Sequence, residues 1–181
     1  ASPPGLTEPA PDAVALDRML RAGARAPDHG RLRPWQFILV EGAARNRLGD
    51  VLADALVRRE PGIPQAAIDK ERSKPMRAPL LIIVAARLRE HRGVPGVEQV
   101  VAAGAAAQNI LLAAHALGFG AFWRTGAAAY DDSVKNALGL RATDAIDQLR
   151  ASYLTTVSGV PAPHLIEDPR ALGNNDFYRC R

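Results

Sequence analysis

The sequence predicts an α+β fold, in which helices are layered on a sheet. Segments with helical periodicity alternate with short apolar segments, and the segment 80–86 is apolar without alternation, as in a strand that helices cover on both faces. A chain of 181 residues with no linker-like tract is within the size of one domain. We therefore expect a single domain over residues 1–181. Periodicity does not reveal which strands run antiparallel.

We expect helices over residues 13–24, 43–58, 65–72, 98–117 and 132–138. We expect strands over residues 36–41, 80–86, 121–124 and 152–157. Asp12 supplies an N-cap for the first helix, and Pro27 closes it. Pro61 and Gly62 break the second helix before the short charged one. We interpret the charged segment 70–74 as a solvated helix face.

The helix expected over 98–117 is so rich in alanine and leucine that it is apolar nearly all round. Such a helix is typical of a buried position, because a surface helix keeps a polar face. It is either the central core helix of one subunit or an interface helix between two. If the face that carries Ala106 is at an interface, an unpaired charge there should disrupt assembly.

Composition and charge argue against several classes of protein. The net charge is +4, but the basic residues are scattered among acidic ones, and aromatic residues make up only 5%, which does not favour nucleic-acid binding. The longest unbroken apolar run, 80–86, is shorter than the roughly 20 residues that cross a bilayer. The single cysteine, Cys180, permits no intrachain disulfide, and the histidines lack metal-ligand spacing. We expect a soluble, cytoplasmic protein that binds no nucleic acid, membrane or metal.

A ligand site is expected where the first helix gives way to the first strand, in the segment RAPDHGRLRPWQF at 25–37. Four of its side chains can donate hydrogen bonds to an anion or a polarised carbonyl: Arg25, His29, Arg31 and Arg33. Arg25 and His29 are four residues apart, so they would lie on the same side of the first helix if it continued to them. The alternatives are a solvated surface loop and, for Arg25, a cation that interacts with the helix dipole. We interpret Trp35 as a core residue.

Two motifs together resemble a known family. The run APDHxxxxPWxF at 26–37, followed by GFGAFWRTG at 118–126, resembles the flavin-binding nitroreductase superfamily, most closely its small single-domain branch of NAD(P)H nitroreductases. The resemblance covers roughly residues 2–140. Family members begin with a short helix ending in Arg-Arg-Ser at the flavin phosphate; here Ser2 alone corresponds, and we expect that helix to be missing. Of the family's late apolar strand GFLYLGT, this chain keeps only the Tyr-Leu-x-Thr pattern at 153–156.

The resemblance implies a mixed sheet flanked by helices and an intertwined homodimer with two FMN sites at the interface. It also implies that Ser2 approaches the phosphate, that Arg25 contacts the flavin together with His29 of the partner subunit, and that the other side is lined by Trp123, Arg124 and Thr125. We add Arg31 and Arg33 because they are further cations of the same loop.

The implied function is that of an FMN-dependent oxidoreductase. It would pass hydride from NADH or NADPH to a nitroaromatic, a quinone or a similar conjugated acceptor. The flavin is then the catalyst, and no side chain is assigned as acid or base. No Gly-x-Gly-x-x-Gly or Walker-type loop occurs, so the nicotinamide should bind transiently in the pocket that also takes the oxidant. The alternatives are a non-catalytic flavin- or nucleotide-binding protein and a basic nucleic-acid adaptor.

Overall fold

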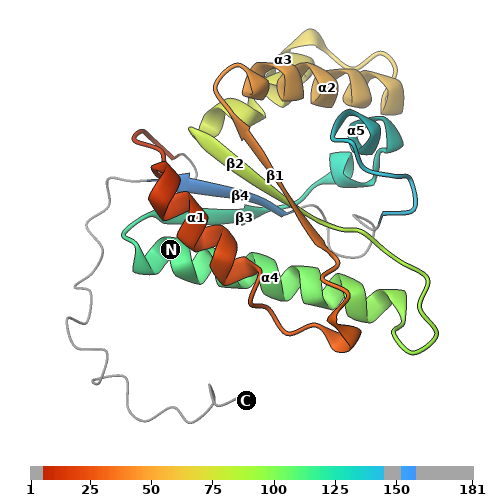
Figure 1. Cartoon of the computed structure of the whole chain (residues 1–181). Helices are drawn as coiled ribbons and strands as arrows, with labels where there is room; N and C mark the ends of the chain where they lie inside the picture. Colours follow the sequence, from red (N-terminus) through yellow and green to blue (C-terminus); the bar gives the residue numbers. More distant parts are fainter. Residues whose placement is uncertain (1–5, 145–151, 158–181) are drawn as a thin grey trace.

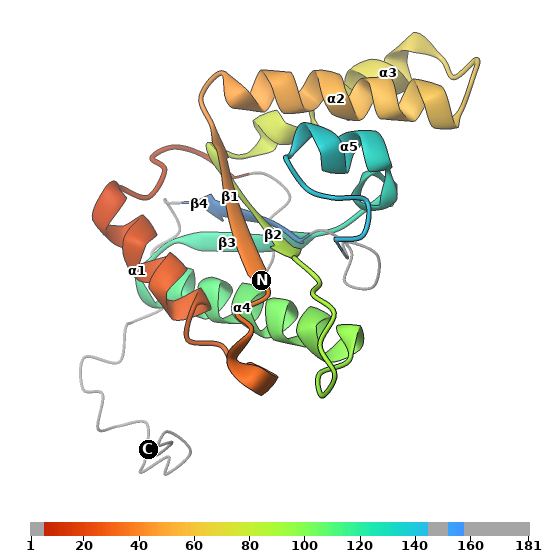
Figure 2. The same cartoon turned by 45° about the vertical axis from the view of Figure 1, so that its right-hand side comes forward.

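Helices lie on both faces of a small sheet (Figure 1). The computed structural model describes residues 6–144 and the strand at 152–157. Two helices, α1 (Ala13–Gly23) and α4 (Gly96–Ala116), cover one face, and Figure 2 shows α2 (Ala44–Arg59) and α5 (Asp132–Ala137) over the other. The short helix α3 (Gln65–Arg72) packs on α2. The α+β class with layered helices is therefore confirmed.

The strands that the structure describes form a four-stranded sheet in the order β1-β2-β4-β3. Their bounds are Trp35–Glu41 for β1, Leu80–Ala86 for β2, Gly120–Arg124 for β3 and Ser152–Val157 for β4. All of these strands pair antiparallel, whereas the resemblance implied a mixed sheet. In the register, Tyr153 pairs with both Ile83 and Arg124, so the end of β3 lies level with the middle of β2.

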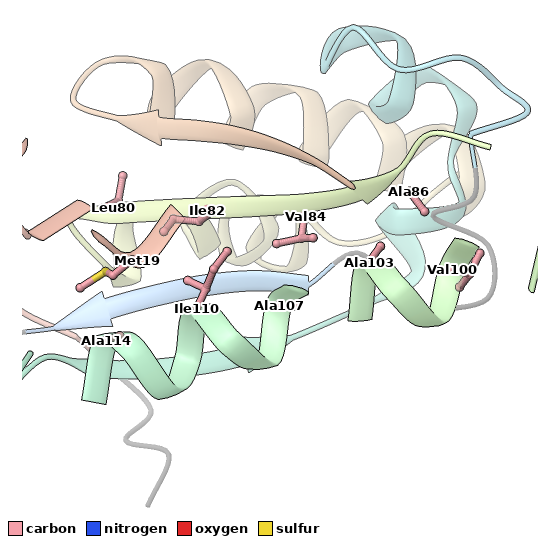
Figure 3. Close-up of a cluster of buried hydrophobic side chains, with 10 residues drawn as sticks. All are labelled: Met19, Leu80, Ile82, Val84, Ala86, Val100, Ala103, Ala107, Ile110 and Ala114. Carbon is pink, nitrogen blue, oxygen red and sulfur yellow. The ribbon is translucent and has the colours of Figure 1, made fainter. Parts of the chain in front are cut away.

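The main hydrophobic core lies between β2 and α4 (Figure 3). All of β2 is buried because helices cover both of its faces, and its alternate residues Leu80, Ile82 and Val84 point toward α4. The helix meets them with small side chains such as Ala103 and Ala107, which let it approach the sheet closely. Full burial of each large aliphatic side chain contributes about 1.5 to 3 kcal/mol.

The first helix illustrates how local signals set the elements. The Asp12 side chain accepts a hydrogen bond from the Ala15 amide at 2.8 Å, as expected of the N-cap. At Gly23 the helix crosses α4, and a Cβ there would lie 2.8 Å from the Ile110 side chain. Nearby, the Asn109 side chain donates to the Ala22 carbonyl at 3.2 Å. These contacts fix α1, and with it the start of the loop expected to bind a ligand, against α4.

Helix α4 has one buried face and one exposed apolar face. Ala106 is fully buried in the subunit's own core, so the condition that its face lies at an interface is not met in this structure. The opposite face instead exposes Val97, Val101 and Leu112, whose exposed fractions are 55%, 63% and 57%. Among the residues described, α4 is also the helix long and apolar enough to cross a membrane; it packs against α1 and the sheet.

Candidate functional site

A cavity of about 140 Å³ lies on the α2 side of the sheet, beside the end of β3. Apolar side chains from three elements form part of its wall: Leu52 of α2, Leu81 of β2 and Phe122 of β3. Four basic side chains and one carboxylate also line the described part of the cavity: Arg59, Lys74, Arg77, Arg124 and Glu71. An apolar wall with an excess of cations suits an anionic ligand that has a flat apolar part.

The end of β3 brings Arg124 to this cavity. Residues two apart in a strand share a face, so Phe122 and Arg124 both line the cavity, and the Arg124 guanidinium lies over the Phe122 ring, 5.3 Å from its centroid. Thr125, which follows the strand, is exposed and also lines the cavity. Trp123 lies between Phe122 and Arg124 in the strand, so its side chain points to the other face and packs against the core cluster on the α4 side.

The opposite wall is the segment from Glu71 to Arg77. Helix α3 is held against α2 at Gly49, where a Cβ would lie only 2.3 Å from the Arg72 carbonyl oxygen, and by an ion pair of 2.9 Å between Arg72 and Asp50. Beyond α3, a 3₁₀ turn, η2 (Lys74–Arg77), leads into β2. The Arg77 carbonyl accepts from the Leu6 amide at 2.9 Å. The wall is therefore held at both of its ends, at Arg72 by the packing on α2 and at Arg77 by the hydrogen bond from Leu6.

Sequence reasoning missed the site residues of this segment. We interpreted 70–74 as a solvated face, but Glu71 and Lys74 line the cavity and form an ion pair with each other. Only 14% of the Glu71 side chain is exposed. The signal that could have found them is the position of the charged run, a few residues before a fully buried strand, where connecting loops often carry binding residues.

The loop that follows α1 lies beside the N-terminal end of α4. His29 Nδ1 lies 2.5 Å from Glu98 Oε2 in the first turn of α4. Arg31 and Arg33 have left-handed backbone conformations, with φ of 54° and 47°, and the Asp28 carboxylate accepts from the Arg33 amide. Such conformations cost a non-glycine residue about 1 to 3 kcal/mol and cluster at binding sites, which favours the ligand interpretation over a plain loop.

The loop does not continue the helix. Helix α1 ends at Gly23, and Asp28 is extended with φ of −149°, so Arg25 and His29 do not share one helical face. The side chains of Arg25, Arg31 and Arg33 are exposed and make no hydrogen bond or ion pair with the residues that the structure describes. Their guanidinium groups are available to a ligand or to a second subunit.

The structure thus divides the site residues expected from the sequence into separate groups. Arg124 and Thr125 line the cavity on the α2 side, whereas the loop of Arg25 to Arg33 contacts α4 on the other side of the sheet. Trp123 also faces α4, and Trp35 is partly buried against the same core, in agreement with its interpretation as a core residue. Ser2 lies outside the described residues.

A second charged cluster is structural. Asp144 is fully buried and accepts hydrogen bonds from the Arg141 amide at 2.9 Å and from its Nε at 3.0 Å. Arg141 in turn donates to the Leu88 carbonyl at 2.8 Å. Burial alone would raise the pKa of Asp144, but the hydrogen bonds from Arg141 and the charges of Arg141 and Arg87 outweigh it and lower that pKa. The cluster ties the segment after α5 to the end of β2.

Comparisons with known proteins agree with this architecture. The model of the Nitroreductase family matches residues 6–152. An Escherichia coli (strain K12) protein named "Putative NAD(P)H nitroreductase YdjA" is 42% identical over 166 residues, which cover 87% of this chain and 88% of that protein.

Two solved structures share the fold. A nitroreductase-like family protein from Bacillus cereus superposes with a TM-score of 0.72 at 22% identity, over 95% of this chain and 88% of that one. A Bacteroides fragilis nitroreductase with bound FMN superposes with a TM-score of 0.64 at 18% identity, over 93% of this chain and 88% of that one. With the family model spanning most of the chain and a relative of 42% identity over nearly its full length, this protein belongs to the nitroreductase family of oxidoreductases.

Proposed function

We propose that this protein is an FMN-dependent oxidoreductase that takes hydride from NADH or NADPH and passes it to a nitroaromatic, a quinone or a similar conjugated acceptor. The observation that carries the proposal is the cavity at the end of β3, where an apolar wall meets four basic side chains and one carboxylate. The name of the E. coli relative supports the NAD(P)H part, and the FMN bound to the B. fragilis nitroreductase supports the choice of cofactor.

The residues of the cavity fit FMN by their chemistry. Phe122, Leu52 and Leu81 offer apolar surface to a flat ring, and Arg124 and Lys74 offer positive charge. Bound FMN would supply the group that accepts and then donates hydride. The role of the protein is to hold that group and to favour negative charge on it: preorganised cations do so with little reorganisation during the reaction.

We further propose that two copies of the chain form the complete site. The exposed apolar face of α4, with Val97, Val101 and Leu112, is the proposed contact between them. The family resemblance supports a contribution of His29 of the partner subunit to the site, together with Arg25, Arg31 and Arg33. Thr125 keeps its proposed cofactor contact in the cavity, and Ser2 keeps its proposed contact with the phosphate. Trp123 packs against the core on the α4 face, so its proposed contact would be with a part of the cofactor that lies outside the cavity. A single-domain, cytoplasmic dimer is the form that we propose.

An absorbance spectrum of the purified protein tests the proposal. We expect a yellow protein whose flavin absorbance bleaches when NADPH or NADH is added without oxygen and returns when a nitroaromatic or quinone is added. Protein without flavin absorbance, even after incubation with FMN, would contradict the proposed cofactor. A bound chromophore that neither nucleotide bleaches would instead favour a non-catalytic flavin-binding protein.

A further inference from the structure

Glu71 is the one carboxylate among the residues that line the described cavity; it pairs with Lys74, and three further basic side chains line the same cavity. We propose that this charge sets the redox potential of the bound FMN, by offsetting part of the positive potential that Lys74 and its neighbours create. The inference rests on the proposed function, because it concerns the cofactor of that same cavity.

The geometry makes Glu71 more than a surface charge. Its side chain is 14% exposed, whereas the side chain of its ion-pair partner Lys74 is 42% exposed. A largely buried charge is screened by salt and water far less than an exposed one, so it acts more strongly on a neighbouring ligand. Its position is also fixed, because α3 cannot move away from α2 without breaking the close packing at Gly49 and the ion pair between Arg72 and Asp50.

The direction of the effect follows from charge. The reduced cofactor carries more negative charge than the oxidised one, so cations in the cavity wall stabilise the reduced form and raise the potential. Glu71 opposes them. Replacement of Glu71 by glutamine removes the negative charge but keeps the length of the side chain and a carbonyl oxygen that can accept from the Lys74 ammonium group.

The variant Glu71→Gln should therefore bind the reduced cofactor more tightly relative to the oxidised one, by about threefold to tenfold at a charge separation of several ångströms. Tenfold corresponds to an increase of about 30 mV in the midpoint potential of a two-electron couple. The potential is measured by titration of the FMN-loaded protein against a reference dye, and it does not depend on turnover.

Two further variants provide controls. Glu71→Asp keeps the charge and should stay close to the wild-type potential. Asp69→Asn removes a carboxylate of the same helix. Asp69 pairs with Arg72 at 3.2 Å and does not line the cavity, so this variant should shift the potential much less than Glu71→Gln. An unchanged or lowered potential in Glu71→Gln, or equal shifts in Glu71→Gln and Glu71→Asp, would overturn the inference.

Failure of the inference can be told apart from failure of the proposed function. If wild-type protein binds FMN and NADPH bleaches it, but Glu71→Gln has the wild-type potential, the proposed function stands and the role of Glu71 is refuted. If wild-type protein binds no FMN, the proposed function is refuted and the role of Glu71 with it.

Discussion

Arg124 lies over the ring of Phe122, with its guanidinium carbon 5.3 Å from the ring centroid. Both side chains project from β3 to the same cavity, so the ring holds the cation where a ligand would meet it. No carboxylate in the described part of the chain pairs with Arg124. This arrangement favours a binding role for Arg124 over a purely structural role in a surface ion pair.

Replacement of Arg124 by alanine should weaken FMN binding by roughly tenfold to more than a hundredfold, because a charge-assisted hydrogen bond contributes about 1.5 to 3 kcal/mol. Lysine should restore only part of the affinity, since it lacks the planar guanidinium. FMN dissociation and thermal unfolding are measured on the same variants. An unchanged FMN affinity would eliminate Arg124 as a cofactor ligand, whatever the change in the melting temperature.

Replacement of Lys74 by methionine should also weaken FMN binding, because it removes a cation from the cavity wall while keeping the apolar stem. We expect a loss of several-fold to about tenfold, less than for Arg124→Ala, because Glu71 already neutralises part of the charge of Lys74. The matched control is Lys70→Met in α3: this lysine is exposed and does not line the cavity. Equal effects of the two variants would indicate that only net charge matters.

A glutamate at Val101, on the exposed face of α4, should dissociate the proposed dimer, since an unpaired charge buried in an interface costs several kcal/mol. Light scattering measures the oligomeric state. The control Val57→Glu adds the same charge at an exposed valine of α2, on the other side of the sheet, and should leave the dimer intact. A Val101→Glu variant that stays dimeric would exclude this face of α4 as the contact.

Ala106→Glu should behave differently from Val101→Glu. Because Ala106 is fully buried within the subunit, a charge there should unfold the chain rather than only separate two folded subunits. Circular dichroism distinguishes the two outcomes, since a dissociated but folded monomer keeps its helical signal. A folded monomeric Ala106→Glu variant would show that this side of α4 faces another subunit.

The buried Asp144 predicts a pH-dependent contribution to stability. Its pKa is lowered in the folded protein, so the ionised carboxylate contributes stability that is fully present above the ordinary carboxyl pKa of about 3.9 and is lost as the pH falls through the lower folded value. Asp144→Asn should lower the free energy of unfolding by about 1.5 to 3 kcal/mol near pH 7. Denaturant unfolding should show that this difference shrinks below about pH 4.

The control for this prediction is Asp54→Asn, which replaces an exposed aspartate of α2. It should change the free energy of unfolding by less than about 0.5 kcal/mol at either pH. If the difference between wild type and Asp144→Asn is the same at both pH values, the ionised carboxylate is not the stabilising group.

Local patterns were sufficient to predict the elements of the fold. The helix that Asp12 caps, the uninterrupted apolar strand 80–86 and the strand at 152–157 all lie where the sequence placed them, within one or two residues. Caps, breakers and hydrophobic periodicity act over a few residues, so they can be read without knowledge of the fold. The two motifs around His29 and Arg124 further indicated the family.

Tertiary packing decided what periodicity could not express. An apolar helix has no polar side to mark its orientation, so only the packed structure distinguishes Ala106, in the core, from Val101, on the exposed face. From the sequence alone, Glu71 and Lys74 are interpreted as solvated charges. The packing of Gly49 against Arg72 places the end of α3 at the cavity. Which residues meet across a cavity depends on contacts between segments far apart in the chain, and no local pattern carries that information.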